Sequence, residues 1–271
     1  MKKIMIAAIA AALSFACVGQ ALAWGRVGHR TIAEIAERHL TPAAKAEIER
    51  YTGGESIVAY AVFMDSVVKM PEYVKPFRGW HASIADEKCK SPLDVRFKHR
   101  KCHDGVTAME DFRASLANRS EMTDSAVLCA IKCIVHIVGD FHCPAHVRYT
   151  DCKNEGKYKV TYYDRKAILH SVWDTGVITH GDRRKWTYGQ YADYLDTWSD
   201  KKIAACTKGW AQEWFEDCAH DVRKSIHWVG EGDVLGDKFQ KKALPLAELE
   251  LRKAGYQLAK ALNTIFGNEE K

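Results

Sequence analysis

Two pairs of histidine and aspartate stand at the same spacing in the middle of the chain. His136 and Asp140 are four residues apart, and so are His170 and Asp174. Residues at this spacing lie one turn apart on one face of a helix, where imidazole nitrogen and carboxylate oxygen can bind one metal ion together. His146 adds a third imidazole shortly after the first pair. These ligand types suit zinc.

The surroundings of these pairs favour a metal centre over isolated hydrogen bonds. A single His–Asp pair one turn apart usually forms a surface or buried hydrogen bond. Here the two pairs stand on otherwise apolar helix faces, and burying an imidazole or a carboxylate without a partner is costly. A metal ion can satisfy several such groups at once.

The first residues of the chain have the pattern of a signal peptide. Two lysines precede an apolar stretch at 4–18, and Ala21–Ala23 supplies the small residues that signal peptidase requires. Cleavage after residue 23 places Trp24 at the mature N-terminus, with His29 close behind it. An α-amine has a pKa near neutrality and is a good ligand once deprotonated. Processing is therefore expected to create a metal ligand in an exported, periplasmic or secreted protein.

Composition indicates one domain over residues 24–271. No second long apolar stretch follows the signal peptide, so we expect no membrane span and a soluble protein, most simply a monomer. The formal net charge of the whole chain is +5, which is too small to indicate nucleic-acid binding by itself.

Eight cysteines follow the signal peptide, and an even number in an exported chain favours disulfides. Cys129 and Cys133 have helical spacing and can both be core residues. A competing interpretation is zinc binding by a thiolate, through Cys133 with His136 or Cys143 with His146. Proximity along the chain suggests three disulfides: Cys89–Cys102, Cys143–Cys152 and Cys206–Cys218.

Hydrophobic periodicity predicts a mainly α protein. Asp124 is expected to cap the most strongly apolar helix, and the segment 71–101 is expected to be a long loop. Residues 157–163 are the best strand candidate, as half of a short β-hairpin. Helices are expected at about 28–40, from 42 onward, and at 60–69, 106–116, 124–138, 188–198, 210–226 and 246–265.

With these residues identified, the chain resembles the zinc-dependent single-strand nucleases and 3′-nucleotidases of fungi and plants, the S1/P1 type. It is more distantly similar to bacterial zinc phospholipases C. The resemblance runs from Trp24 to the C-terminal segment around Leu251–Asn263. It implies a single helical domain with a trinuclear zinc cleft and a short β-hairpin.

The resemblance also implies three zinc ions per chain and the residues that hold them. Asp140 would bridge two zincs and, with Asp65, position the water that attacks phosphorus. The implied reaction is hydrolysis of single-stranded DNA and RNA to 5′-nucleotides and removal of 3′-phosphates. The implied ligands are Asp65, His81, His136 and Asp140 for the first zinc, Trp24, His29 and the shared Asp140 for the second, and His146, His170 and Asp174 for the third.

The residues expected to contact substrate depart from the family pattern. Ala82 and Ile84 stand where relatives carry a base-stacking aromatic residue and an Asp or Asn. Stacking contributes about 1–3 kcal/mol per base, so this change bears on base preference. Lys157 replaces a family Asn near the phosphate, and Lys69 corresponds to a family basic residue with the register off by one. Both lysines are candidate substrate contacts.

Two other functions remain open at this point. One is a zinc phosphodiesterase or phospholipase C acting on another phosphoester, although those enzymes tend to carry Glu where this chain has Asp174. The other is a non-catalytic relative that only binds zinc or nucleic acid, which the altered substrate positions leave open.

Overall fold

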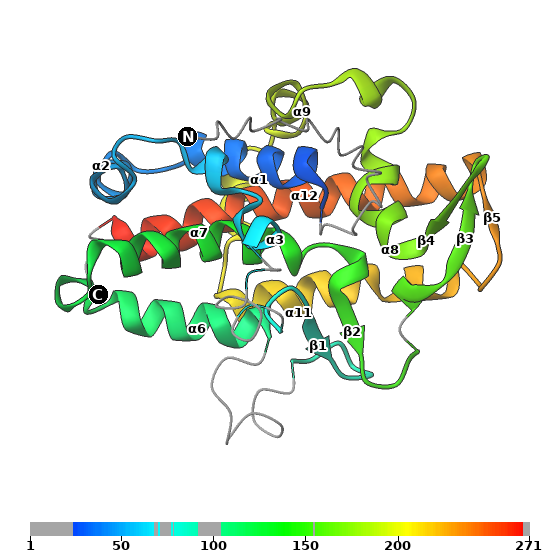
Figure 1. Cartoon of the computed structure of the whole chain (residues 1–271), viewed down its shortest axis with the longest axis horizontal. Coiled ribbons are helices and arrows are strands. Elements are labelled where there is room, and N and C mark those ends of the chain that lie inside the picture. Colours follow the sequence, from blue (N-terminus) through cyan, green and yellow to red (C-terminus); the bar gives the residue numbers. More distant parts are fainter. Residues whose placement is uncertain are drawn as a thin grey trace, which may run out of the picture.

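The computed structural model describes residues 24–67, 70, 77, 79–91, 104–153 and 155–267. Within these ranges the protein is mainly helical, as the sequence predicts, and Figure 1 shows long helices lying side by side with small strands at the margin. The described helices are α1 (Arg26–Arg38), α2 (Pro42–Thr52), α3 (Phe63–Val67), α6 (Gly105–Leu116), α7 (Asp124–Asp140), α8 (Leu169–Ser171), α9 (Tyr188–Leu195), α10 (Asp200–Cys206), α11 (Ala211–Val222) and α12 (Asp237–Phe266).

The central helix is α7, which packs against α1, α2, α3, α6 and α12. Its apolar side chains are almost fully buried, from Val127 to Val138. Thr123 is its N-cap, with the hydroxyl accepting from the Ala126 N–H at 3.3 Å, and Asp124 is the first helical residue. The N-cap is therefore Thr123 and not the expected Asp124. The side chains of both residues can accept from backbone N–H groups of the first turn, so the sequence alone does not distinguish them.

The C-terminal helix α12 extends further than its hydrophobic pattern indicates. It begins at Asp237 and continues through Pro245, whereas the sequence predicts a start at residue 246. A proline normally interrupts a helix, because it lacks the N–H group and its ring crowds the preceding turn. The second half of α12 packs against α1, and this contact buries Ile35 and Leu251 completely.

Two small sheets complete the described fold. β1 (Ser83–Ala85) pairs with β2 (Val147–Tyr149) in parallel, with Ser83 opposite Val147. β3 (Lys159–Tyr162) and β4 (Arg165–Ile168) form the predicted antiparallel hairpin, and β5 (Val234–Leu235) adds to β3 in parallel. The β1–β2 pair is not predicted from the sequence, because three-residue strands carry almost no periodicity.

Other helix boundaries differ from the sequence expectations by short 3₁₀ segments. The helix expected at 60–69 is a 3₁₀ turn at Ile57–Tyr60 followed by α3. The helix expected at 210–226 is α11 followed by a 3₁₀ turn at Arg223–His227. Among the described residues, no helix is both long and apolar enough to cross a membrane. The predicted signal peptide, Lys69 and most of the expected 71–101 loop lie outside the described residues.

The expected Cys143–Cys152 disulfide is wrong. Cys143 carries a free thiol that is completely buried at the end of α7. Its Sγ donates to Asp174 Oδ1 at 3.2 Å. Proximity along the chain is a poor guide here, because the turn after α7 directs this side chain inward.

The expected Cys206–Cys218 disulfide is also wrong. Both residues carry free thiols, on α10 and α11 respectively. Cys89 likewise carries a free thiol, and its expected partner Cys102 lies outside the described residues.

Candidate metal centre

Asp140, the last residue of α7, collects three imidazoles around one carboxylate. Its Oδ1 lies 3.2 Å from His29 Nε2, and its Oδ2 lies 2.9 Å from His81 Nδ1 and 3.3 Å from His136 Nε2. All three histidines are predicted ligands. The carboxylate itself is 1 % exposed, so these imidazoles replace water around it.

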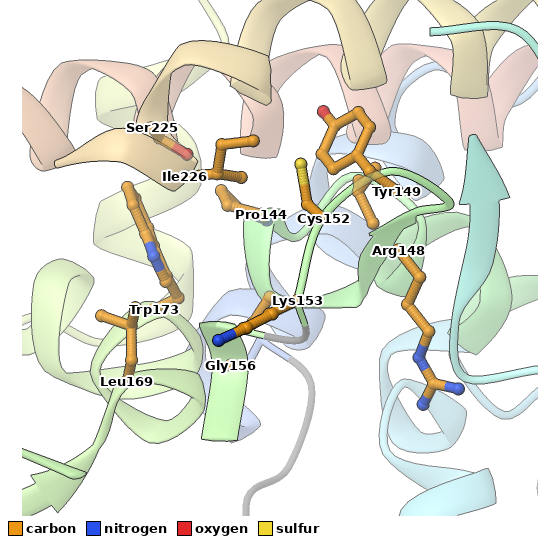
Figure 2. Close-up of a pocket in the computed structure, with 12 residues that line it drawn as sticks. Pro144, Arg148, Tyr149, Cys152, Lys153, Gly156, Leu169, Trp173, Ser225 and Ile226 are labelled. Carbon is orange, nitrogen blue, oxygen red and sulfur yellow. The ribbon is translucent and has the colours of Figure 1, made fainter. Parts of the chain in front are cut away.

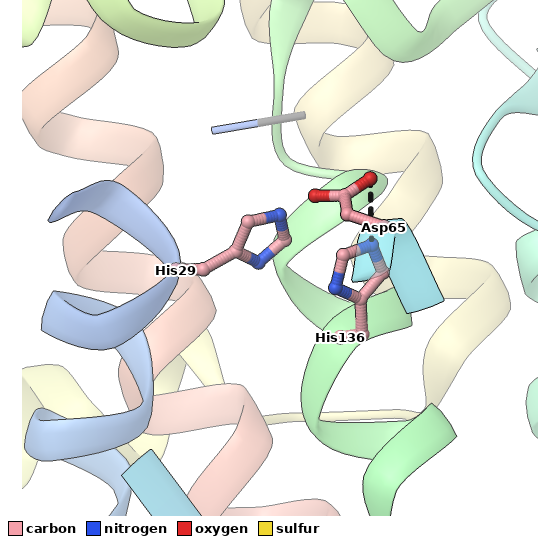
Figure 3. Close-up of side chains that lie close together, drawn as sticks. All are labelled: His29, Asp65 and His136. Atoms are coloured by element: carbon pink, nitrogen blue, oxygen red, sulfur yellow. Dashed lines mark ion pairs between the residues drawn. The ribbon is translucent and has the colours of Figure 1, made fainter. Parts of the chain in front are cut away.

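Asp65 supplies a second carboxylate to the same group from α3. Figure 3 shows its carboxylate above the ring of His136, with His29 approaching from α1. Asp65 Oδ1 is 3.7 Å from His136 Nε2 and 3.8 Å from His81 Nδ1. Asp65 and His81, which are expected ligands through the resemblance, therefore meet His136 and Asp140 in space.

The approach of His29 depends on a glycine in α7. The ring of His29 stacks on His136 with centroids 4.2 Å apart. A Cβ at Gly139 would lie 2.7 Å from His29 Nδ1, which is closer than real Cβ contacts allow. Only glycine at this position lets the α1 histidine reach Asp140.

The segment before α1 is held against the third group of predicted ligands. Trp24 is completely buried, and the Gly25 N–H donates to the main-chain oxygen of Asp174 at 2.6 Å. A Cβ at Gly25 would lie 2.2 Å from Thr175 Oγ1. The predicted mature N-terminus therefore lies inside the cluster, beside His29 in sequence and Asp174 in space.

The β1–β2 pair joins the two halves of the cluster. His81 directly precedes the turn into β1, and His146 directly precedes β2. The His146 Nδ1–H group donates to the His81 main-chain oxygen, and His136 Nδ1 is 2.9 Å from the Ala61 oxygen. These backbone contacts leave Nε2 of both rings for a metal ion, which is the usual arrangement of metal-binding histidines.

His146, His170 and Asp174 form a further group at hydrogen-bond distances. His146 Nε2 lies 2.9 Å from His170 Nε2, and His170 Nε2 lies 3.1 Å from Asp174 Oδ2. His146 Nε2 is 3.8 Å from Asp174 Oδ1. Asp174 belongs to a π-helical turn at Val172–Gly176, which continues from α8 and keeps the predicted one-turn spacing to His170.

The electrostatics of the centre fit a bound cation. Among the described residues, Asp65, Asp140 and Asp174 form ion pairs with histidines alone. Burial raises the pKa of Asp174 to about 7 and lowers the pKa of His146 to about 3, which favours the neutral form of each.

Several buried nitrogen and oxygen atoms that could bind a metal ion also lack hydrogen-bond partners in the described part of the chain. Asp65 Oδ2, His29 Nδ1 and His81 Nε2 make no hydrogen bond with any described residue. Buried polar atoms are normally satisfied, and carboxylate oxygen and imidazole nitrogen are ligands for zinc. A divalent ion would satisfy these atoms and allow the carboxylates to ionise.

A cavity of about 190 Å³ opens beside the third group. Figure 2 shows Lys153 reaching toward Trp173 on one side, while Arg148 lies on the other. Pro144 and Ala145, which precede the predicted ligand His146, also line the cavity. The sequence offers no periodic signal for such a cavity, because its lining comes from turns.

The substrate contacts expected from the resemblance receive no direct support. Lys157 ends the 3₁₀ turn at Glu155–Lys157, but Gly156 lines the cavity and Lys157 does not. Lys69 lies outside the described residues. Ala82 is 8 % exposed, so this position offers little surface for a base. Both lysines therefore remain predictions.

Fold and centre together define a helical protein whose buried histidines and aspartates converge from distant segments. The S1/P1 Nuclease family model matches residues 24–267, so the chain belongs to this family. The predicted family membership and nuclease class are confirmed.

The relatives are similar over most of their length. Endonuclease 2 of Arabidopsis thaliana is 26 % identical, over 90 % of this chain and 91 % of the relative. Nuclease S1 of Aspergillus oryzae is 24 % identical, over 89 % of this chain and 91 % of the relative. Nuclease P1 of Penicillium citrinum is 22 % identical, over 91 % of this chain and 99 % of the relative.

Proposed function

We propose that this chain is an exported nuclease with three zinc ions. It would cleave single-stranded DNA and RNA to 5′-nucleotides and remove 3′-phosphates. The observation that supports this most directly is the convergence of three imidazoles on Asp140, with Asp65 and the His146–His170–Asp174 group adjoining it. The names of the relatives, nucleases and endonucleases, agree with a nucleic-acid substrate.

The predicted ligand sets follow the spatial groups. Asp65, His81, His136 and Asp140 would hold one ion, and Asp140 would also serve a second with His29 and the Trp24 amine and carbonyl. His146, His170 and Asp174 would hold the third. Bound zinc supplies Lewis acidity, which lowers the pKa of a coordinated water toward 7 and stabilises charge on phosphate oxygens.

The protein residues contribute position and charge. Asp140 is fixed at the end of α7 by imidazoles on both oxygens, so it can orient ligands on two sides. Asp65 is 3.7 Å from His136 and lies on the same side as His81, where its second oxygen can accept from a water. Burial of the group excludes bulk water and strengthens these interactions.

The cavity beside the third group is the proposed place for the nucleotide next to the cleaved bond. Lys153 and Arg148 at its margin can attract phosphate oxygens, and the Trp173 ring lies on its wall.

Export and processing are part of this proposal. Residues 1–23 would be removed as a signal peptide, and residues 24–271 would form the mature domain. The burial of Trp24 and the Gly25–Asp174 hydrogen bond support an N-terminus that acts inside the centre. Retaining a methionine before Trp24 should lower both zinc content and activity, whereas full activity with that extension would exclude the N-terminal ligand.

The experiment that tests the function combines metal content with substrate choice. Mature protein is sequenced from its N-terminus, analysed for zinc and assayed on single-stranded DNA, RNA, double-stranded DNA, a 3′-nucleotide and phosphatidylcholine. We expect three zincs, a Trp24 start, and cleavage of single strands and the 3′-nucleotide. Hydrolysis of phosphatidylcholine alone would instead support a phospholipase.

A pair of histidine variants provides the control for that experiment. His136→Ala should lose zinc and activity. His39→Ala removes a histidine that pairs with Asp196 at 2.8 Å, outside the three metal groups, and should retain both. A zinc-loaded wild type without activity on the generic substrate bis-p-nitrophenyl phosphate would contradict a catalytic role.

A further inference from the structure

Cys143 lies within the third group of metal-binding atoms. Its Sγ is 3.2 Å from Asp174 Oδ1, and the ligand atoms of Cys143, His146 and Asp174 all lie within 4.8 Å of one another. His170 Nε2 is in turn 2.9 Å from His146 Nε2 and 3.1 Å from Asp174 Oδ2. Cys143 therefore adjoins the group formed by His146, His170 and Asp174.

The separations between these atoms are close to those of a tetrahedral zinc site. Bond lengths of about 2.3 Å to sulfur and about 2.0–2.2 Å to nitrogen and oxygen place tetrahedral neighbours about 3.3–3.7 Å apart. Among His146, His170 and Asp174 the distances run from 2.9 Å between the two imidazoles to 3.8 Å between His146 and Asp174, and Cys143 Sγ lies 3.2 Å from Asp174 and within 4.8 Å of His146. A small expansion of the group therefore accommodates one ion at its centre.

The local backbone directs the sulfur into this space. The Cys143 N–H donates to the Asp140 oxygen at 3.0 Å, and the His146 N–H donates to the Cys143 oxygen at 2.8 Å. This turn, closed by Pro144, places Cys143 and His146 on the same side. Hydrogen bonds from backbone groups of Trp24 and Ala145 also reach the Cys143 side chain.

Two further observations separate this thiol from a buried packing residue. Both Cys143 and Asp174 are completely buried, and Asp174 Oδ2 makes no hydrogen bond of good geometry with any described residue. His170 Nε2, at 3.1 Å, is the one ion-pair partner of this oxygen among the described residues, and a cation at the centre of the group would satisfy a buried carboxylate better than this poorly aligned contact. The sulfur lies beside the other oxygen of the same carboxylate.

We propose that Cys143 is the fourth ligand of the metal ion held by His146, His170 and Asp174, which makes this a Cys–His₂–Asp site. This inference rests on the proposed metal centre. Binding would convert the thiol to a thiolate, with its proton released to solvent. A thiolate fills the fourth tetrahedral position and favours soft ions such as Zn²⁺, Co²⁺ and Cd²⁺ over Mn²⁺ or Mg²⁺.

The test is spectroscopic and does not depend on activity. Zinc X-ray absorption of the wild-type protein should show a sulfur neighbour at about 2.3 Å. The cobalt-substituted protein should show a thiolate-to-cobalt charge-transfer band in the near ultraviolet. Cys143→Ser should lose that band while cobalt still fills the other two sites.

Cys218→Ser is the matched control. Cys218 is also completely buried, and its thiol lies beside the carboxylate of Glu250, yet no described histidine belongs to a metal-binding group with it. Its removal should leave the band unchanged. The wild-type absorption measurement needs no variant, so it decides the question even if Cys143→Ser does not fold.

The outcomes distinguish this inference from the proposed function. A wild type that holds three metals without a sulfur neighbour overturns the thiolate ligand and leaves the nuclease proposal intact. A charge-transfer band that persists in Cys143→Ser also overturns it. A wild type that binds no metal overturns both.

Discussion

The protein contains two clusters of carboxylates, one partly exposed around Lys253 and one buried among histidines, and their charges are balanced in different ways. Between α11 and α12, Lys253 Nζ lies 2.6 Å from both Asp217 Oδ2 and Asp221 Oδ2 and 3.5 Å from Glu250 Oε1. In the metal centre, Asp65, Asp140 and Asp174 form ion pairs only with histidines among the described residues. The first cluster contains its own permanent cation, and the second contains the groups proposed to bind one.

The comparison shows how charge distinguishes a structural cluster from a binding site. One ammonium group cannot neutralise three carboxylates, and burial raises the pKa of Glu250 to about 8 despite the opposing effect of Lys253. The lysine cluster therefore lowers its net negative charge by holding a proton on Glu250. The candidate metal centre has carboxylate oxygens and imidazole nitrogens without hydrogen-bond partners among the described residues, and a divalent ion would satisfy them.

The largest difference between the clusters should appear when their central groups are removed. Asp140→Asn keeps the shape of the side chain but removes the charge shared by two proposed metal sites. We expect loss of two zincs and a fall in nuclease kcat/KM of about 10³ or more, since several kcal/mol of metal stabilisation are lost.

The matched variant is Asp196→Asn, which alters a His–Asp pair outside the centre. It should keep full zinc content and activity. Loss of a single zinc from Asp140→Asn would show that this aspartate does not bridge two ions.

Lys253→Met should have the converse effect. It removes the cation from a partly exposed carboxylate cluster and should lower the free energy of unfolding by about 1 kcal/mol. Zinc content and kcat/KM at a temperature where the variant is folded should stay within about twofold of wild type. Denaturant unfolding with metal analysis measures both quantities, and a loss of zinc would mean that the clusters are coupled.

Gly139→Ala should disturb the metal centre without changing its ligands. The added methyl group would displace His29, whose Nδ1 is 2.7 Å from the position of the new Cβ. We expect a 10- to 100-fold fall in kcat/KM, about the effect of disturbing groups that orient metal ligands.

Gly189→Ala is the control for this methyl group, because the nearest atom to a Cβ there is Thr187 Oγ1 at 3.9 Å. Unchanged zinc content and activity in Gly139→Ala would exclude His29 from the centre.

A final prediction concerns the pH dependence of stability. Folding raises the pKa of Glu250 from 4.5 to about 8, so between these values the folded protein holds one proton more than the unfolded chain. Stability is therefore present below pH 4.5 and is lost as pH rises toward 8, by about 1.4 kcal/mol per unit for this group. Glu250→Gln should remove that part of the slope in unfolding experiments from pH 5 to 8. An unchanged slope would show that Glu250 is ionised in the folded protein.

Much of the centre could be predicted because its ligands are local in sequence. The His136–Asp140 and His170–Asp174 pairs follow from one-turn spacing, which the helix and the π-helical turn preserve. Asp65 and His81 have no such local partner. They reach the centre through α3 and the β1–β2 pair, and only the resemblance identified them.

The incorrect disulfide prediction for Cys143 also arises from contacts between residues distant in sequence. Sequence proximity suggests a disulfide for Cys143, but the turn closed by Pro144 directs its sulfur toward Asp174. The long helices were predictable because their apolar stripes are extended, as in α7. The start of α12 was not, since its first turns are partly exposed and contain Pro245.

The parallel pairing of Ser83 with Val147 has a consequence for folding of the chain during synthesis. This pairing joins His81 to His146, and the same centre needs His29 from α1 and Asp174 from beyond β4. Contacts so distant in sequence form late in folding, because long loops must close first. A ribosome-bound chain that does not yet include Asp174 cannot assemble the full centre.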